Sequence, residues 1–395
     1  MIDVPFFSVL TFNLSDVIRT FILGAMNTDN YATWLEIDLG AIESNYKELQ
    51  KIACKPVMPV IKANAYGHGL EETAKKLDRI GVEWCGVARI EEALLLRDLG
   101  IGMKILVLGY TSPLRIHDAL RESISLAVYD FSVAKAYSNQ VKGSNHPLRL
   151  HAKIDTGMGR LGIPSEDAVR FIELIKNTQG FELEGCFTHF ACADEQENPL
   201  TDEQLARFEK ILNELDTLGI RPSIVHAANS AATLYHSNAR FDMVRCGIAL
   251  YGLPPSSSKP LPTSFTPVMS WKTRLISLKN LPKGHGVSYG VKYHTSRDER
   301  IGVIAAGYGD GLRRRPGNHM LLRGKRVPVV GNVCMDQCML QLDNVPEAQI
   351  GDEVVLIGNQ GEEEITVTDI ANDWGTINYE VTCGMAARMP RRYFG

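Results

Sequence analysis

The chain has 395 residues, of which 45% are hydrophobic and 22% are charged, a composition typical of a folded globular protein. This length exceeds one ordinary hydrophobic core and favours two or three domains. The formal net charge of −4 gives no electrostatic reason to expect a nucleic-acid partner. The eight cysteines include no CxxC pair, so we expect neither a metal site nor a thioredoxin motif. A reducing, cytoplasmic setting fits this cysteine usage.

Residues 1–29 are predicted to be an N-terminal extension that is disordered or dispensable. Residues 6–12 are largely apolar, but Asp16 and Arg19 follow closely, so no membrane span is expected. The opening Met-Ile-Asp lacks the basic residues with which a secretory signal begins.

Residues 40–262 alternate short apolar runs with helical patterns. Strands that are buried on both faces, with helices between them, are typical of parallel βα units. Eight such units predict a (β/α)₈ barrel of the TIM type. The count leaves an early strand in residues 30–39 unassigned, and we expect it to join a second domain. The predicted barrel strands are 56–61, 83–88, 104–108, 125–129, 148–154, 182–188, 223–227 and 242–245, with clear helices at 90–99, 165–177 and 201–218.

A Pro- and Ser-rich stretch, residues 254–267, has the composition of a linker. Beyond it, closely spaced strands with glycine-rich turns and no long helices indicate a β domain of barrel or sandwich type. The predicted fold is therefore α/β: the barrel, followed by a mainly-β C-terminal domain built from residues 263–395 and 30–39. The clearest strands of this domain are 272–278, 300–305, 320–322, 326–330 and 353–357.

Polar side chains follow several predicted barrel strands at their carboxyl ends, where enzymes of this fold place their catalytic groups. A lysine amine becomes a nucleophile when burial or neighbouring cations lower its pKa, and Arg160 and Arg245 are candidate neighbours for Lys62. A structural ion pair is the alternative interpretation of Lys62. The carboxyl ends of the predicted barrel strands carry Lys62, Lys153, His189, His226 and Arg245. A charged group is costly at a buried strand end, so these five residues together indicate one polar site.

The loops after barrel strands seven and eight commonly bind phosphate through backbone N–H groups and a short helix. Asn229-Ser230 and Gly247-Ile248 fall at these places and offer a hydroxyl group and free amides. Gly247 alone is also explained as a residue that turns the chain. Together with an activated Lys62, the two loops indicate a phosphorylated aldehyde as cofactor.

Residues 60–69, Val-Ile-Lys-Ala-Asn-Ala-Tyr-Gly-His-Gly, resemble the pyridoxal-lysine signature of the alanine racemases. The resemblance implies a pyridoxal 5′-phosphate (PLP) barrel joined to a β domain, in a head-to-tail homodimer whose subunits share the active site. It implies an isomerase that interconverts L-alanine and D-alanine, which is a peptidoglycan precursor in bacteria. Further matching segments are 153–162, 188–194, 226–231, 241–253, 286–290, 331–337 and 378–388.

In the mechanism that the resemblance implies, Lys62 holds PLP as an aldimine and then acts as the base on one face of the substrate. Tyr289, in Gly-Val-Ser-Tyr-Gly, acts on the opposite face from the other subunit. Racemisation needs a proton donor and an acceptor on opposite sides of one planar carbanion, so two bases fit the task. His189 and Arg245 resemble the hydrogen-bonded chain that assists the tyrosine in this family.

The resemblance also implies that Arg245 leaves the pyridine nitrogen unprotonated, because arginine only donates hydrogen bonds, and that this suppresses transamination. Arg160 would bind the phenolic oxygen of the cofactor and the carboxylate of the substrate. Lys153 resembles a lysine that is often carbamylated in the family, with a salt-bridged lysine as the alternative. The remaining implied contacts are Tyr66, Asn229, Ser230, Gly247, Ile248 and Tyr379 for the cofactor, and Met335 and Asp336 for the substrate from the partner subunit.

Other conspicuous residues have simpler interpretations. Residues 307–311 are glycine-rich, but they lack GxGxxG spacing and a following helix, so a dinucleotide site is not expected. His68 is interpreted as structural, Tyr308 as a residue at the site entrance, and residues 313–315 as a solvated basic cluster.

Two other functions compete with racemisation. A non-catalytic PLP-binding barrel lacks an appended β domain and a counterpart of Tyr289, whereas this chain has both. A related decarboxylase of basic amino acids is disfavoured by the pairing of Arg245 with Tyr289. The sequence leaves undecided whether serine is a substrate and whether the role is biosynthetic or catabolic.

Overall fold

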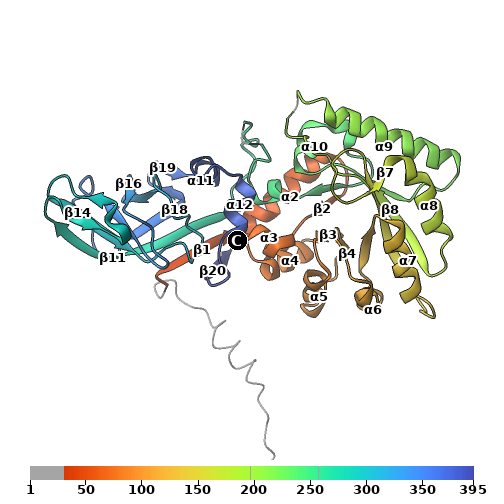
Figure 1. Cartoon of the computed structure of the whole chain (residues 1–395), viewed down its shortest axis with the longest axis horizontal. Coiled ribbons are helices and arrows are strands. Elements are labelled where there is room, and N and C mark those ends of the chain that lie inside the picture. Colours follow the sequence, from red (N-terminus) through yellow and green to blue (C-terminus); the bar gives the residue numbers. More distant parts are fainter. Residues whose placement is uncertain (1–30, 196, 257) are drawn as a thin grey trace, which may run out of the picture.

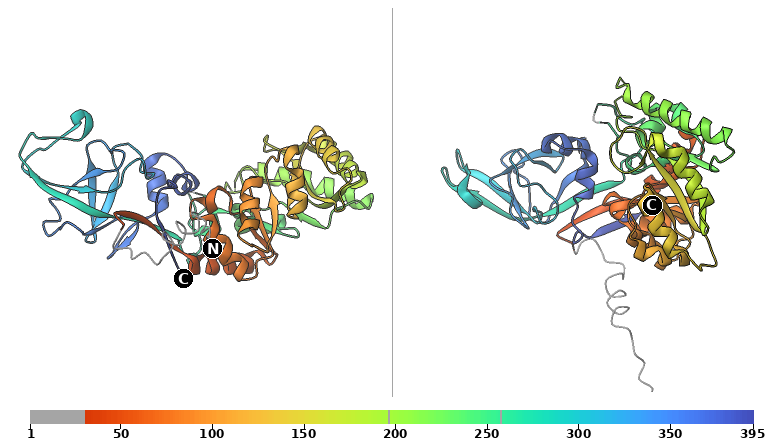
Figure 2. Two further views of the ribbon diagram at one scale, coloured as in Figure 1. Left: turned by 90° about the horizontal axis from the view of Figure 1, so that it is seen from below. Right: turned by 45° about the vertical axis from the view of Figure 1, so that its right-hand side comes forward.

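The computed structural model describes residues 31–195, 197–256 and 258–395. The predicted N-terminal extension lies outside the described residues. Figure 1 shows two domains side by side along the long axis, a barrel with outer helices and a mainly-β domain. Figure 2 shows the same division from two other directions. No helix in these described ranges is long and apolar enough to cross a membrane.

Eight parallel strands form the barrel, and each overlaps a run predicted from the sequence. Six of them lie in one continuous sheet, and the remaining two pair with each other. A Val60–Gly86 bridge and a bond from the Arg245 N–H to the Ala228 carbonyl, 2.9 Å long, join the two parts into a ring. The predicted (β/α)₈ fold is therefore confirmed. In ring order the strands are β2 (Val57–Pro59), β3 (Trp84–Val87), β4 (Lys104–Val107), β5 (Ser125–Val128), β6 (Leu148–Asp155), β8 (Phe181–Phe187), β9 (Ile224–His226) and β10 (Val244–Cys246).

Burial on both faces explains why the barrel strands are continuous apolar runs. All four residues of β3 and of β5 are buried. Met58, Trp84, Leu106 and Met243 form one buried cluster, separate from the larger core against which the helices pack. Side chains alternate along a strand, so this smaller cluster fills part of the barrel interior.

The outer helices bury one face each and expose a charged face. In α4 (Leu70–Arg79), Ala74 and Leu77 are buried, while Lys75 pairs with Glu71 at 2.7 Å on the exposed side. The other barrel helices are α2 (Leu39–Ala53), α5 (Ile90–Asp98), α6 (Ile116–Arg121), α7 (Phe131–Gln140), α8 (Ala168–Asn177), α9 (Leu200–Thr217) and α10 (Ser230–Tyr235).

The second domain is built on β11 (Met269–Leu281), the longest strand of its sheet. β11 pairs with β14 (Glu299–Ile304) and with β18 (Glu353–Gln360), which closes six strands into a ring and confirms the mainly-β architecture. The early strand β1 (Thr33–Asp38) pairs antiparallel with β11 and parallel with β20 (Arg391–Phe394). The remaining strands are β15 (His319–Leu322), β16 (Lys325–Val330), β17 (Cys338–Gln341), β19 (Glu363–Ile365), and the hairpin β12 (Gly286–Val287) and β13 (Tyr293–His294).

Two short helices near the C-terminus, α11 (Val367–Trp374) and α12 (Asn378–Cys383), are not predicted by the strand pattern. Elements of 8 and 6 residues show too little periodicity for a sequence assignment. In Figure 1, α12 lies beside the barrel rather than in the sheet. Asn378 Nδ2 donates to the Pro254 carbonyl at 3.1 Å, which ties α12 to the end of the barrel domain.

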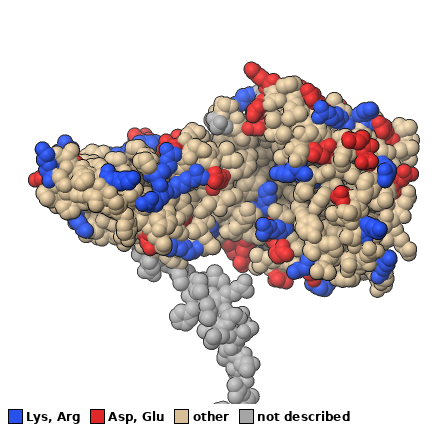
Figure 3. Space-filling view, in the orientation of Figure 1, with Lys and Arg blue, Asp and Glu red and all other residues tan. Residues whose placement is uncertain are grey.

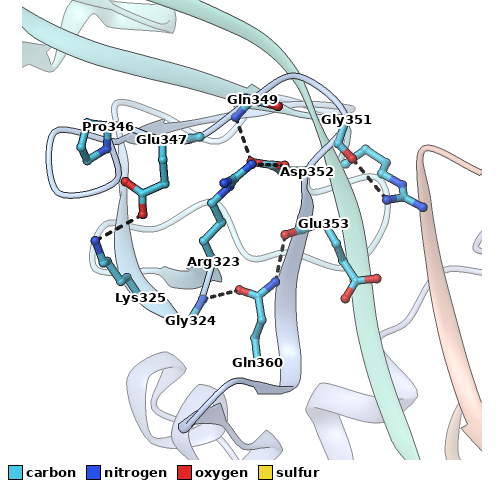
Figure 4. Close-up of polar contacts among 12 residues, drawn as sticks. Arg323, Gly324, Lys325, Pro346, Glu347, Gln349, Gly351, Asp352, Glu353 and Gln360 are labelled. Carbon is cyan, nitrogen blue, oxygen red and sulfur yellow. Dashed lines mark hydrogen bonds and ion pairs between the residues drawn. The ribbon is translucent and has the colours of Figure 1, made fainter.

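Polar side chains tie the turn between β15 and β16 to its neighbours (Figure 4). Arg323 donates to both carboxylate oxygens of Asp352, at 2.7 and 3.0 Å. Gln360 accepts from the Gly324 N–H and donates to the Glu353 carbonyl, each at 3.0 Å. The surface charge of the molecule is mixed. Figure 3 shows basic and acidic side chains interspersed over both domains on the face in view.

Candidate active site

A cavity of about 590 Å³ opens at the carboxyl ends of the barrel strands and is bordered by α12. Tyr289, Met335 and Asp336 belong to the β domain and do not line it. Cys383, at the end of α12, lines it without having been singled out by the sequence. His226, at another of the polar strand ends, is completely buried and does not line the cavity either. The cavity brings together the remaining residues predicted for the site: Lys62, Tyr66, Lys153, Arg160, His189, Asn229, Ser230, Arg245, Gly247, Ile248 and Tyr379.

Lys62 begins a left-handed turn, α3 (Lys62–Tyr66), soon after β2 ends. The four residues after Lys62 all have φ between +53° and +55°. This conformation costs roughly 1–2 kcal/mol for each residue that has a Cβ, so contacts must hold it. Asn64 Oδ1 accepts from the Leu70 N–H at 2.8 Å, which secures the end of the turn. The turn fixes the direction in which Lys62 leaves the strand.

Glu92, in the first turn of α5, supports the lysine turn from the next βα unit. Its Oε1 accepts from the Ala63 N–H at 2.7 Å. Its Oε2 accepts from the Ala88 and Arg89 N–H groups at 2.8 and 3.1 Å. Sequence reasoning missed this residue because the capping-box signature is incomplete: Arg89, not Ser or Thr, precedes it by three positions. Its carboxylate joins the start of α5 to the residue after Lys62.

Positive charge accumulates in the cavity. Burial lowers the pKa of the Lys62 ammonium, and the nearby Arg160 lowers it further. Burial lowers the pKa of Lys153 to about 8, with further contributions from Arg160 and Arg245. A ligand with negative charge would relieve this repulsion, so the cavity is suited to an anion.

Arg245 is almost completely buried and is held by four acceptors. Its Nη1 donates to His226 Nδ1 at 2.8 Å. Its Nη2 donates to the Thr188 and Ala227 carbonyls at 2.8 and 3.0 Å and to His189 Nδ1 at 3.0 Å. Burial lowers the pKa of Arg245 to about 9, so the guanidinium remains charged at neutral pH. Among the described residues no acceptor takes its Nε–H, which leaves that group for a ligand in the cavity.

His189 is a neutral hydrogen-bond donor toward the cavity. Burial and then the charge of Arg245 lower the pKa of His189 well below its ordinary value. Because Arg245 donates to Nδ1, the single proton of this imidazole lies on Nε2.

A corner of hydroxyl and amide groups lies at the ends of β9 and β10. Ser230 Oγ accepts from the Gly247 N–H at 3.0 Å, and the Asn229 side chain caps α10. A Cβ at Gly247 would lie 2.3 Å from the Tyr66 hydroxyl, so only glycine fits there. Burial raises the pKa of Tyr66 and Tyr379, so both keep their protons as hydrogen-bond donors. Such a corner matches the requirements of a phosphate group.

Tyr289 lies on an exposed loop of the β domain, with 73% of its surface accessible. The preceding Ser288 has a φ of +66°, and its Oγ donates to the Asn332 carbonyl at 2.6 Å. Asn332 Nδ2 in turn donates to the Tyr289 carbonyl at 2.6 Å. These bonds tie the tyrosine loop to the loop that carries Met335.

The glycine-rich residues 307–311 support the loop of Met335 and Asp336. The Gly309 N–H donates to the Met335 carbonyl at 2.8 Å. Arg388 Nη2 lies 2.8 Å from the Oδ1 atoms of both Asp310 and Asp336. A Cβ at Gly309 would lie 2.7 Å from Arg388, so the glycine leaves room for this bridge. The motif is therefore a support for a neighbouring loop.

In the part of the chain that the structure describes, no group of three or more His, Cys, Asp or Glu side chains could hold a metal ion.

The alanine racemase N-terminal domain family matches residues 37–255, and the alanine racemase C-terminal domain family matches residues 268–393. The alanine racemase of Symbiobacterium thermophilum is 44% identical, covering 92% of this chain and 97% of its own length. That of Geobacillus kaustophilus is 45% identical, covering 92% and 94%. The solved alanine racemase of Bacillus anthracis with bound L-Ala-P has a TM-score of 0.87 at 40% identity, covering 92% of this chain and 95% of that one. The chain therefore belongs to the alanine racemase family.

Proposed function

We propose that this protein is an alanine racemase that interconverts L-alanine and D-alanine with PLP and two bases, Lys62 and the partner subunit's Tyr289. The observation that carries the proposal is the cavity in which Lys62 leaves a strand end beside Arg160 and Arg245. The substrate follows from the relatives, which are named for alanine. All eight cysteines are free thiols, which fits a cytoplasmic enzyme that supplies D-alanine.

The residues of the cavity fit PLP. Lys62 would hold the aldehyde carbon, and Arg245 would donate its Nε–H to the pyridine nitrogen. When bound, PLP withdraws electrons from the α-carbon of an amino acid and thereby acidifies its C–H bond. Arg160 would face the phenolic oxygen and the substrate carboxylate. The phosphate would take the donor corner formed by Tyr66, Asn229, Ser230, Gly247, Ile248 and Tyr379.

The two bases would move protons at opposite faces of the α-carbon. Burial and Arg160 lower the pKa of Lys62, which favours the neutral amine that accepts a proton. The partner subunit's Tyr289 would receive a hydrogen bond from His189 Nε2, which stabilises its phenolate form. Arg245 keeps its charge and has no proton to give up at neutral pH, so it would hold the pyridine nitrogen as a hydrogen-bond acceptor and would not protonate it.

The second base requires a second subunit. Tyr289 and Met335 are 73% and 52% exposed and lie on neighbouring loops outside the cavity of their own chain. Asp336 is held beside them by Arg388. We infer a head-to-tail homodimer in which this face of the β domain covers the cavity of the partner and completes the site.

Lys153 is proposed to carry a carbamate. A pKa of about 8 leaves a fraction of neutral amine at physiological pH, and this is the form that reacts with CO2. The product would replace a cation by an anion near Arg160 and so turn a repulsion into an attraction.

The test is incubation of the PLP-loaded protein with L-alanine in D2O. We expect D-alanine to form with deuterium at the α-carbon, and Lys62→Ala to lose both this activity and the absorbance of the lysine-bound cofactor. Serine at matched concentrations measures the substrate range. A PLP-saturated wild-type protein that neither forms D-alanine nor exchanges the α-hydrogen would defeat the proposal.

A further inference from the structure

A chain of hydrogen-bonded polar side chains runs through the barrel interior from the buried Arg245 to Glu184, which is partly exposed. Arg245 Nη1 donates to His226 Nδ1 at 2.8 Å, and His226 Nε2 lies 2.9 Å from His151 Nδ1. His151 Nε2 lies 3.2 Å from Glu184 Oε2, and Ser125 Oγ donates to the same oxygen at 2.6 Å. We call Arg245, His226, His151 and Glu184 the buried chain. It connects the cavity with a carboxylate that does not line it.

Close packing holds the two imidazoles in place. Both histidines are completely buried. The His226 ring stacks on Phe187 with centroids 4.7 Å apart, and the Trp84 ring meets His151 edge-on at 5.6 Å. A Cβ at Gly185 would lie 2.4 Å from His151 Nδ1, so glycine is required for the ring to reach His226. The absence of a side chain at Gly185 and the packing of Phe187 and Trp84 therefore leave space for the two imidazole rings and hold them in place.

The two ends of the buried chain fix the proton positions between them. Arginine only donates, so His226 Nδ1 accepts and its proton lies on Nε2. That proton is donated to His151 Nδ1, which leaves the His151 proton on Nε2, facing Glu184. Burial raises the pKa of Glu184, but hydrogen bonds from His151 and Ser125 outweigh this and hold the pKa below its ordinary value. The acceptor at this end is therefore an ionised carboxylate.

We propose that Glu184 is a positioning residue that, through His151 and His226, keeps an acceptor facing Arg245 and so aims the guanidinium Nε–H at the cavity. The consequence for catalysis rests on the proposed function. Without an acceptor at position 184, the histidines can exchange tautomers and present an N–H to Arg245, a contact between two donors. The guanidinium then loses its anchor, and the control over where the proton returns is weakened.

Glu184→Leu removes the acceptor, and Glu184→Gln retains an oxygen that accepts. Glu182→Leu is the matched control, because Glu182 lies on the same strand and is half exposed, with Arg149 at 3.6 Å as its ion-pair partner. The first readout is ¹⁵N NMR of histidine-labelled, PLP-loaded protein. Wild type, Glu184→Gln and Glu182→Leu are expected to show the single tautomers described above, and Glu184→Leu a mixture.

The second readout is the ratio of racemisation to transamination, measured as D-alanine against pyruvate. We expect Glu184→Leu to lower this ratio about tenfold, by analogy with the lower end of the effect of residues that orient the ligands of a metal ion, with Glu184→Gln near wild type. If Glu184→Leu does not fold, His151→Phe keeps the ring against Trp84 while breaking the chain, and the same drop is expected.

Unchanged tautomers and an unchanged ratio in a folded Glu184→Leu or His151→Phe protein would overturn the proposal. Failure of the proposed function looks different. In that case the wild type itself would not racemise alanine, while the NMR comparison would still report whether Glu184 fixes the tautomers.

Discussion

The cations at the barrel mouth differ in chemistry because their surroundings differ. Arg245 is surrounded by acceptors and keeps its charge even though burial lowers its pKa to about 9. Lys62 lies beside Arg160, which adds to the effect of burial and favours the amine. The Lys153 ammonium lies 5.7 Å from the centre of the Phe187 ring and has the pKa lowered to about 8. In the proposed function, lysine would therefore serve as a base at position 62 and as a site for modification at position 153.

The lowered pKa of Lys153 predicts a pH dependence of stability. Between about pH 8 and pH 10.5, the folded chain binds fewer protons at Lys153 than the unfolded chain does. The free energy of unfolding should therefore rise with pH across this window. Below the window, the destabilisation caused by burying the charged Lys153 ammonium is fully present. Lys153→Met should raise the free energy of unfolding at pH 7 by about 1–3 kcal/mol. It should also reduce the increase of this free energy between about pH 8 and pH 10.5.

This is measured by urea unfolding in CO2-free buffer over a series of pH values. Adding bicarbonate is expected to stabilise the wild type at pH 7 and to leave Lys153→Met unchanged, because only the lysine forms a carbamate. A Lys153→Met protein that is less stable than wild type in CO2-free buffer would contradict the account.

At the scale of elements, the direction of Lys62 depends on two adjoining βα units. The left-handed α3 supplies the turn, and α5 supplies the carboxylate of Glu92 that holds it. Both oxygens of Glu92 accept hydrogen bonds from backbone N–H groups. An amide cannot satisfy this arrangement, because its NH2 group would face another donor.

Glu92→Gln is therefore predicted to loosen the turn at a cost of about 1–3 kcal/mol. The apparent Kd for PLP should rise tenfold or more, since about 1.4 kcal/mol corresponds to a factor of ten. An absorbance titration of apoprotein with PLP measures this. Glu91→Gln, an exposed neighbour in the same helical turn, is the control and should bind PLP as wild type does. Equal affinities in the two variants would exclude this role of Glu92.

The bridge of Arg388 makes a different prediction, because it acts on a loop of the β domain. Arg388→Gln removes the ion pairs to Asp310 and Asp336. We expect a several-fold higher KM for alanine with unchanged PLP affinity, since the proposed cofactor site lies in the barrel. Arg326→Gln removes an exposed ion pair of the same domain, to Glu363, and should leave KM unchanged. If Arg388→Gln bound PLP more weakly and kept the wild-type KM for alanine, the prediction would be contradicted.

The sequence predicts the elements that have a regular pattern and misses those that depend on distant contacts. The barrel strands are predictable because burial on both faces makes them continuous apolar runs. The left-handed turn after Lys62 has no such pattern, because Ala63 to Tyr66 include no glycine and the turn is held by Glu92. The buried chain is hidden for the same reason: Glu184 resembles any strand glutamate until Gly185 and His151 are seen beside it.

At the scale of the whole molecule, the proposed site is divided between two domains that belong to different subunits. The barrel carries Lys62 and the groups for the cofactor, while the β domain carries Tyr289, Met335 and Asp336 on an exposed face. Exposed aromatic and apolar side chains of this kind are typical of interfaces. The proposed dimer uses each β domain to complete the other subunit's cavity.

This division is tested most directly by mixing two inactive variants, Lys62→Ala and Tyr289→Phe, under conditions that let subunits exchange. Each variant homodimer lacks one base in both sites, whereas a mixed dimer has one site with Lys62 and the partner subunit's Tyr289 intact. The account predicts recovery of about one quarter of the wild-type rate, since half of randomly exchanged dimers are mixed and each has one complete site. Mixing Lys62→Ala with the double variant should recover nothing. No recovery in the first mixture, with subunit exchange demonstrated, would contradict the shared site.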